Sequence, residues 1–146
     1  MALQIRTEIV IEASKEQVWS ILTNLGAYQE WNPFIVSSKG SVAKGERIEN
    51  TMRTGEKSMT FKPVILEVRQ GQYFEWLGSL WFKGIFDGRH YFEIQELGPN
   101  QVNLVHGETF SGILSGMIFR SIGEDTRNNF VKMNQALKAR AEQAGV

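Results

Sequence analysis

Residues 86–112 read FDGRHYFEIQELGPNQVNLVHGETFSG, and their alternating pattern predicts two amphipathic strands joined by a turn at residues 98–100. Successive side chains of a strand point to opposite sides, so even-numbered residues share one face. Within residues 86–94 and 102–110 that face carries apolar residues or glycine apart from His90, His106 and Glu108. We therefore expect both histidines of the chain and one glutamate to lie on the inner side of a β-sheet.

Antiparallel pairing of these strands must keep both apolar faces on the same side, which admits few registers. One register sets His90 opposite Glu108 and Phe92 opposite His106, and another sets His90 opposite His106. In both, the three polar side chains form one patch. A buried polar group without a partner costs roughly 1–3 kcal/mol, so the patch must be internally hydrogen-bonded, hydrated or satisfied by a ligand. A self-satisfied His–Glu pair that only sets the register and a contact with a ligand explain the spacing equally well.

The composition excludes several classes of protein. Sixteen basic residues balance sixteen acidic ones without a run of like charge, so nucleic acid is not an expected partner. The absence of cysteine excludes disulfides and thiolate chemistry and fits a reducing compartment. Residues 3–12 alternate instead of forming the apolar segment of a signal peptide, and no apolar run is long enough for a transmembrane segment. We expect a single domain, residues 1–146, in the cytoplasm.

The rest of the chain predicts a strand, two short helices, further strands and one long helix. The first strand covers residues 5–11, Ser14 opens a helix with the capping-box sequence SKEQ, and residues 27–30 form a second helix. Four more β segments follow, at residues 35–42, 46–54, 58–69 and 73–82. A change of apolar phase at Pro63 indicates a bulge or an edge. Residues 115–144 carry apolar side chains at helical spacing.

A single helix should cover this antiparallel sheet poorly, because its apolar stripe is narrow and includes Thr126 and Asn129. The sheet offers six large inward side chains, Phe61, Phe74, Trp76, Phe92, Leu104 and Phe110. Each aromatic ring buries roughly 150–250 Å² when covered, more in total than the stripe can cover. This predicts an internal cavity between sheet and helix. The alternative is that the rings fill the core by touching one another.

Three parts of the chain resemble a known family. They are IEASKEQVWSILTNLGAYQEWNPFI at residues 11–35, FEWLGSL at 74–80, and the pair FDGRHYFEI and HGETFSGIL at 86–94 and 106–114. With the order of elements, they are similar over essentially the whole chain to the START-like helix-grip superfamily (SRPBCC), of polyketide cyclase/dehydrase and lipid transport type. The resemblance implies an α+β helix-grip fold. In it a curved seven-stranded antiparallel β-sheet wraps around a long C-terminal α-helix, with two short helices after the first strand.

The resemblance also implies a ligand cavity between sheet and helix, with Trp31 and Phe34 near its mouth. It places the polar patch inside and makes the first half of the last helix another wall, but it supplies no universal catalytic residue. The candidate ligand-binding residues are Trp31, Phe34, Phe61, Phe74, Trp76, His90, Phe92, His106, Glu108, Phe110, Met117 and Ile122. No cofactor and no metal are expected; a zinc ion on the two histidines and Glu108 is the less favoured alternative.

A fold does not determine a function, so several functions are considered. Two of them would use the polar patch. The favoured one is binding or carriage of a small hydrophobic or amphipathic molecule, aromatic molecules included. The other is an enzyme similar to polyketide cyclases and dehydratases. It would use His90 or His106 as general base and Glu108 as orienting partner or general acid.

A third function is a protein-interaction module resembling the activators of heat-shock ATPases, which share this scaffold. Its partner surface or homodimer contact would be an exposed apolar cluster of Trp81, Phe82 and Ile85. We prefer the interpretation that these side chains cap one end of the sheet. A small apolar ligand therefore remains the expected partner.

Overall fold

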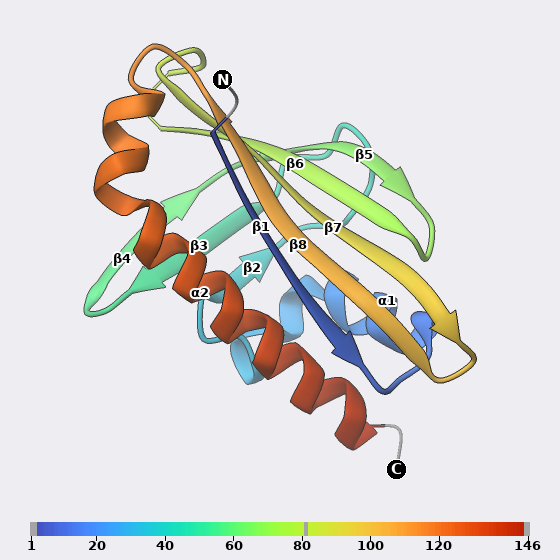
Figure 1. Cartoon of the computed structure of the whole chain (residues 1–146). Helices are drawn as coiled ribbons and strands as arrows, with labels where there is room; N and C mark the ends of the chain where they lie inside the picture. Colours follow the sequence, from blue (N-terminus) through green and yellow to red (C-terminus); the bar gives the residue numbers. More distant parts are fainter. Residues whose placement is uncertain (1–2, 81, 145–146) are drawn as a thin grey trace.

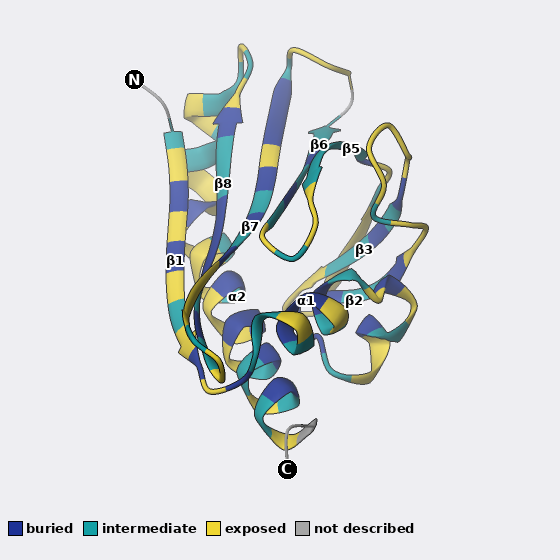
Figure 2. Cartoon of the chain, turned by 90° about the vertical axis from the view of Figure 1, so that its right-hand side faces the viewer, coloured by how far each residue is buried: buried dark blue, intermediate teal, exposed yellow. Residues whose placement is uncertain are grey.

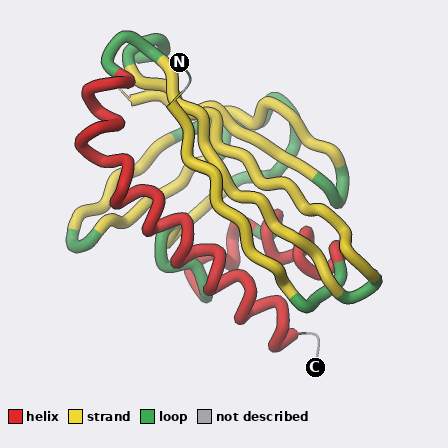
Figure 3. The backbone as a smooth tube through the Cα atoms, viewed as in Figure 1, coloured by secondary structure: helices red, strands yellow, loops and turns green. Residues whose placement is uncertain are grey.

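The computed structural model describes residues 3–80 and 82–144, and there the chain forms two antiparallel sheets and a long helix (Figure 1). In chain order the elements are β1 (Leu3–Ile11), α1 (Lys15–Thr23), η1 (Leu25–Glu30), β2 (Ile35–Lys39), β3 (Glu49–Thr54), β4 (Lys57–Phe61), β5 (Val64–Arg69), β6 (Tyr73–Leu80), β7 (Phe86–Gly98), β8 (Gln101–Ser111) and α2 (Ser115–Ala144). The larger sheet has the order β1-β8-β7-β6-β5 and the smaller one β2-β3-β4. Helix α2 runs diagonally beside β1 and β8 (Figure 3). The predicted α+β helix-grip fold is confirmed.

The described residues form eight strands where seven were expected, and Pro63 explains the difference. The predicted strand 58–69 is divided at Pro63 into β4 and β5, since proline has no N–H with which to continue a ladder. The chain before β3 connects the two sheets across this break: the Ile48 N–H donates to Pro63 O (2.9 Å), and the Ile65 N–H donates to Glu46 O (2.8 Å). Counted as one bent strand, β4 and β5 restore the predicted number.

Other boundaries differ from the prediction by a few residues. Strand β2 ends before Gly40, whose φ of 119° turns the chain, and a Cβ at this position would lie 2.9 Å from Ile48 Cγ2. The predicted segment 73–82 ends as β6 at Leu80, and its residue 81 lies outside the described residues. The second helix is a 3₁₀ helix and begins at Leu25. Helix α2 has the predicted bounds.

Only half of the predicted capping box forms at the start of α1. Ser14 is the N-cap, and its hydroxyl accepts a hydrogen bond from the Gln17 N–H (3.2 Å). The Gln17 side chain does not return to Ser14; its amide donates to Ala141 O (3.0 Å) near the end of α2. This bond joins α1 to the long helix.

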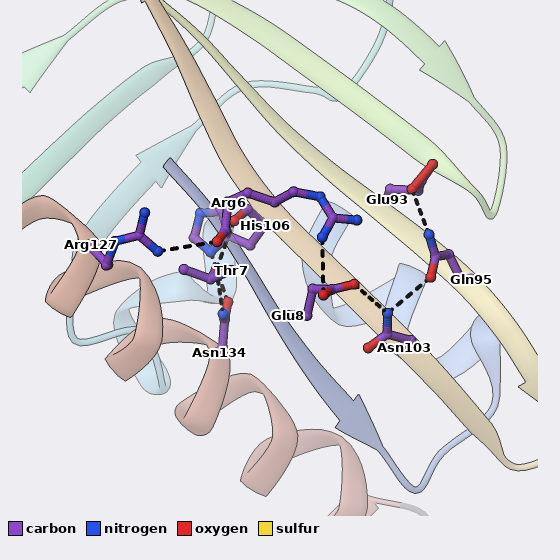
Figure 4. A network of polar contacts seen from close by, with 9 residues as sticks. All are labelled: Arg6, Thr7, Glu8, Glu93, Gln95, Asn103, His106, Arg127 and Asn134. Atoms are coloured by element: carbon purple, nitrogen blue, oxygen red, sulfur yellow. Dashed lines mark hydrogen bonds and ion pairs between the residues drawn. The ribbon is translucent and has the colours of Figure 1, made fainter. Parts of the chain in front are cut away.

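Helix α2 also covers the free edge of the larger sheet. Lys138 Nζ donates to Val10 O (3.0 Å) on β1. Arg127 Nη1 donates to Arg6 O (3.3 Å), also on β1 (Figure 4). Along β1, buried residues alternate with more exposed ones, as Figure 2 shows. Because unpaired edge carbonyls invite pairing with another chain, these side chains protect β1 while its inner residues face the helix.

The space between the sheet and the C-terminal half of α2 is filled by side chains. Phe130, Met133, Leu137 and Ala141 are fully buried on the inner face of the helix. The ring of Phe130 lies 5.7 Å from that of Phe34, which the corner after η1 brings in. The predicted cavity therefore has no room beneath this half of the helix.

Candidate functional site

The polar patch forms as predicted, in the register that sets His90 opposite Glu108. His90 on β7 is paired with Glu108 on β8, and Phe92 is paired with His106. Both imidazoles are completely buried on the inner face of the sheet. The Glu108 side chain retains 17% of its exposure, so that one edge of the patch reaches the surface.

Two further residues extend the patch into a chain of hydrogen bonds. The Thr7 hydroxyl on β1 donates to His106 O (2.7 Å) and accepts from Asn134 Nδ2 on α2 (2.8 Å). Asn134 Oδ1 lies 2.8 Å from His106 Nδ1 (Figure 4), and the Nε2 atoms of His106 and His90 are 2.7 Å apart. At the other end, His90 Nδ1 is buried and has no hydrogen-bond partner among the described residues. Glu108 Oε1 lies 3.6 Å from this nitrogen, beyond hydrogen-bonding distance.

Sequence reasoning missed Thr7 and Asn134, although each left a signal. Thr7 interrupts the apolar inner positions of β1, and Asn134 lies one helical turn after Phe130 on the buried stripe of α2. Each is a polar residue at a position that periodicity assigns to the core. Because buried polar groups need partners, both positions called for a polar neighbour on another element.

Gly88 is a third residue of the site that the sequence did not single out. It lies on the inner face of β7, two residues before His90, and Glu108 reaches across it. A Cβ at this position would collide with Glu108 Oε2. The missing side chain therefore gives the carboxyl group its place beside His90.

Aromatic rings enclose both imidazoles. His106 is stacked on Phe130, with ring centroids 4.1 Å apart and planes within 3°, and Phe92 lies 4.4 Å away on β7. His90 is stacked on Trp76 at 4.6 Å. Both imidazoles are therefore out of contact with bulk water, and their polar atoms interact in a medium of low polarity.

Burial keeps all three ionisable groups neutral near pH 7. It lowers the pKa of His90 to about 3 and raises the pKa of Glu108 to about 8. Burial also lowers the pKa of His106 well below its ordinary value; the neighbouring His90 lowers it further, and the bond to Asn134 raises it. The approach of His90 to Glu108 is thus a contact between a neutral imidazole and a carboxylic acid, not an ion pair.

Several predicted ligand-binding residues lie in the packed core. Phe74, Trp76 and Phe92 are buried and in mutual contact, with ring centroids 5.1–6.1 Å apart. Trp19 on α1 covers Phe74 edge-on at 5.6 Å. These rings fill the core by touching one another, as the alternative to an internal cavity proposes.

The remaining candidates lie around the first half of α2 and the smaller sheet. Phe110 is buried against Phe119, 5.4 Å away, while Trp31 and Phe61 are half-buried. Two candidates on α2 are open to solvent, Met117 with 58% and Ile122 with 39% exposure. Of the apolar cluster considered for a protein partner, Phe82 is exposed, Ile85 is half-buried and residue 81 lies outside the described part.

Two depressions, of about 330 and 410 Å³, lie elsewhere on the described surface. The first is bordered by α1, η1 and the turn after β2, the second by the β7–β8 turn. Among residues 3–80 and 82–144, no three histidine, cysteine or carboxylate side chains gather as a metal-binding group. The facing Nε2 atoms of the two histidines, 2.7 Å apart, leave no room for an ion between them.

Comparison with known proteins identifies the family. The sequence profile of polyketide cyclase / dehydrase and lipid transport proteins matches residues 2–142, and the chain belongs to this family. No curated protein matches the sequence. In the described part of the chain, no helix is long and apolar enough to cross a membrane.

Solved structures share the fold at low sequence identity. The Zhui aromatase/cyclase from Streptomyces sp. R1128 has a TM-score of 0.82 at 12% identity, over 100% of this chain and 97% of that one. A START superfamily protein from Mycobacterium smegmatis has a TM-score of 0.74 at 18% identity, over 97% and 98%. Norcoclaurine synthase from Thalictrum flavum has a TM-score of 0.75 at 11% identity, over 100% and 98%.

Proposed function

We propose that the chain binds a small amphipathic molecule, whose polar group contacts Glu108 and whose apolar part lies against the first half of α2. The observation that carries this proposal is the buried, unpartnered His90 Nδ1 beside a partly exposed carboxyl group. An unsatisfied buried acceptor costs roughly 1–3 kcal/mol, which a protein retains where the group serves a further purpose. A ligand that orders the Glu108 carboxyl would also satisfy His90.

The distribution of buried side chains supports this location. Beneath the C-terminal half of α2 the core is solid, whereas Ile118 and Phe119 in the first half are only partly buried. Met52 and Phe61 on the smaller sheet are likewise incompletely covered. Phe119 lies against Phe110, two residues after Glu108 on β8, so apolar surface begins beside a polar group, as in a small-molecule site. An occupant would remove this surface from water at roughly 25 cal/mol per Å².

Matched pairs of probes test the proposal: naphthol with naphthoate, and decanol with decanoate. At least one of the four should raise the melting temperature of the protein and quench the fluorescence of Trp76, because a ligand bound only to the folded state stabilises it. Trp76→Phe identifies the signal of this ring among the four tryptophans. Failure of all four to bind would refute the proposal.

A second function, acid–base catalysis, is favoured by one observation. Glu108 is a neutral acid at pH 7, and the neutral imidazole beside it exposes a lone pair. An acid and a base within reach of one another can move a proton during cyclisation or dehydration of a bound substrate. Glu108→Gln separates the two functions: a catalyst should lose kcat far more than affinity, whereas a carrier changes only in affinity.

A further inference from the structure

One backbone carbonyl determines the direction of the buried hydrogen-bond chain. His106 O can only accept, so the Thr7 hydroxyl donates its proton to it. The Thr7 oxygen must then accept from the Asn134 amide, and Asn134 Oδ1 therefore faces His106 Nδ1. Since an amide oxygen also only accepts, His106 carries its proton on Nδ1.

The two histidines continue the hydrogen-bond chain in the same direction. Burial keeps His106 neutral, so its Nε2 bears a lone pair and can only accept. His90 Nε2, at 2.7 Å, must donate to it. A neutral His90 then has its lone pair on Nδ1, which is the atom that lacks a partner and faces Glu108.

We propose that this one-way chain makes the Glu108 end of the patch a hydrogen-bond acceptor, so that the site selects a hydroxyl group, phenolic or alcoholic, and rejects a carboxylate. The inference rests on the proposed binding function and specifies the polar group of its ligand. Thr7 and Asn134 are positioning residues in it, because they act on the ligand only through the two histidines.

The protonation of Glu108 leads to the same selectivity in both of its states. In the neutral acid, a small rotation that a bound ligand imposes lets Glu108 donate its single proton to His90 Nδ1, which ends the cost of an orphaned acceptor, roughly 1–3 kcal/mol. The other oxygen, above Gly88, then offers lone pairs only. In the ionised form both oxygens accept. A ligand hydroxyl finds an acceptor in either case, whereas a carboxylate meets lone pairs or a like charge.

Two measurements test the inference on the intact protein. In ligand-free protein, nitrogen NMR of the histidines should show the proton on Nδ1 of His106 and on Nε2 of His90; the opposite tautomers would overturn it. Calorimetry at neutral pH should show naphthol or decanol binding roughly tenfold or more tightly than its carboxylate partner. A carboxylate that binds as tightly would overturn the selectivity and leave the binding function standing, whereas failure of all four probes to bind would overturn both.

Variants of Thr7 test whether the direction of the hydrogen-bond chain, and not the fold alone, sets the selectivity. Thr7→Val preserves the shape but removes the donor to His106 O, so the amide of Asn134 is no longer held in one orientation. The preference for hydroxyl over carboxylate should then fall toward parity and the histidine tautomers should mix. Thr7→Ser restores the donor and should restore both. Full selectivity with single tautomers in a folded Thr7→Val protein would contradict the proposed relay.

Discussion

Glu108→Gln is predicted to remove a pH dependence of stability that the folded protein owes to this buried acid. The pKa of Glu108 is raised from 4.5 to about 8 because the carboxyl group is buried. At ~1.36 kcal/mol per pH unit, the difference between these values sets an upper limit of ~5 kcal/mol. Glu108 retains 17% exposure, so solvent screens part of the effect, and roughly 2–3 kcal/mol is the change we expect.

Stability falls with rising pH because Glu108 ionises at a lower pH in the unfolded chain than in the folded protein. In the unfolded chain Glu108 loses its proton near 4.5, and in the folded protein only near 8. The contribution to stability is therefore complete below 4.5 and is lost as pH rises through 8. Glutamine has no proton to lose, and its amide can donate to His90 Nδ1 in place of the acid. The difference in unfolding free energy between wild type and Glu108→Gln should thus decrease steadily with rising pH.

Urea unfolding followed by tryptophan fluorescence, from about pH 5 to about pH 9, measures this difference directly. Taking the difference cancels the contributions of the histidines and of the surface charges to the extent that these are independent of Glu108. Glu124→Gln, on the exposed surface of α2, is the matched control for the removal of one carboxyl group. A flat line for Glu108→Gln, or a wild type that gains relative stability at high pH, would show that Glu108 ionises freely in the folded protein.

Three further predictions follow from the same contacts. Gly88→Ala should weaken ligand binding and lower the free energy of unfolding by roughly 1–3 kcal/mol, because the new Cβ displaces Glu108. The control Gly26→Ala has open space around its Cβ and should change neither quantity. Equal effects of the two substitutions in calorimetry and urea unfolding would contradict this prediction. Phe130→Ala removes the ring stacked on the buried imidazole and should cost roughly 3–5 kcal/mol in the same unfolding assay; a loss below about 1 kcal/mol would mean that the core is not packed there. Since burial lowers the pKa of both histidines, their contribution to stability should be present above about pH 6.5 and be lost as pH falls toward about 3; acid titration of a variant with both histidines replaced by phenylalanine should lack this step.

The register of β7 and β8 was predictable from the sequence because alternation leaves so little choice. Pairing must keep even positions together, and the structure has one of the few registers that this rule admits. The bounds of α2 were predictable for a similar reason, since thirty residues of helical spacing form a long periodic signal. Local periodicity is sufficient where an element has one clearly apolar face.

The partners of the patch could not be predicted in this way. Thr7 and Asn134 are 127 positions apart in the chain, and their contact depends on how α2 crosses β1. Alternation and helical spacing describe a single element, so they show which side chains are buried but not which ones meet. The position of Gly88 beneath Glu108 depends likewise on a side-chain rotamer, which sequence periodicity does not specify.

The expected cavity is absent beneath the C-terminal half of α2 because more than one helix covers the sheet. Trp19 on α1 packs on Phe74, and Phe34 at the corner after η1 packs on Phe130. These rings, in addition to the apolar stripe of α2, cover the inner side chains. The histidines also fill space, since His106 lies between Phe130 and Phe92. Partly covered apolar surface remains at the first half of α2, at Ile118 and Phe119.

A naphthol titration followed by NMR tests the central claim most directly. In uniformly isotope-labelled protein, the carboxyl carbon of Glu108 and the ring nitrogens of His90 should shift and saturate together. The backbone amides of Ser41 and Gln70, in the depression beside α1, should remain unchanged. Saturable shifts at Ser41 and Gln70 with none at Glu108 and His90 would place the ligand elsewhere and contradict the proposed site.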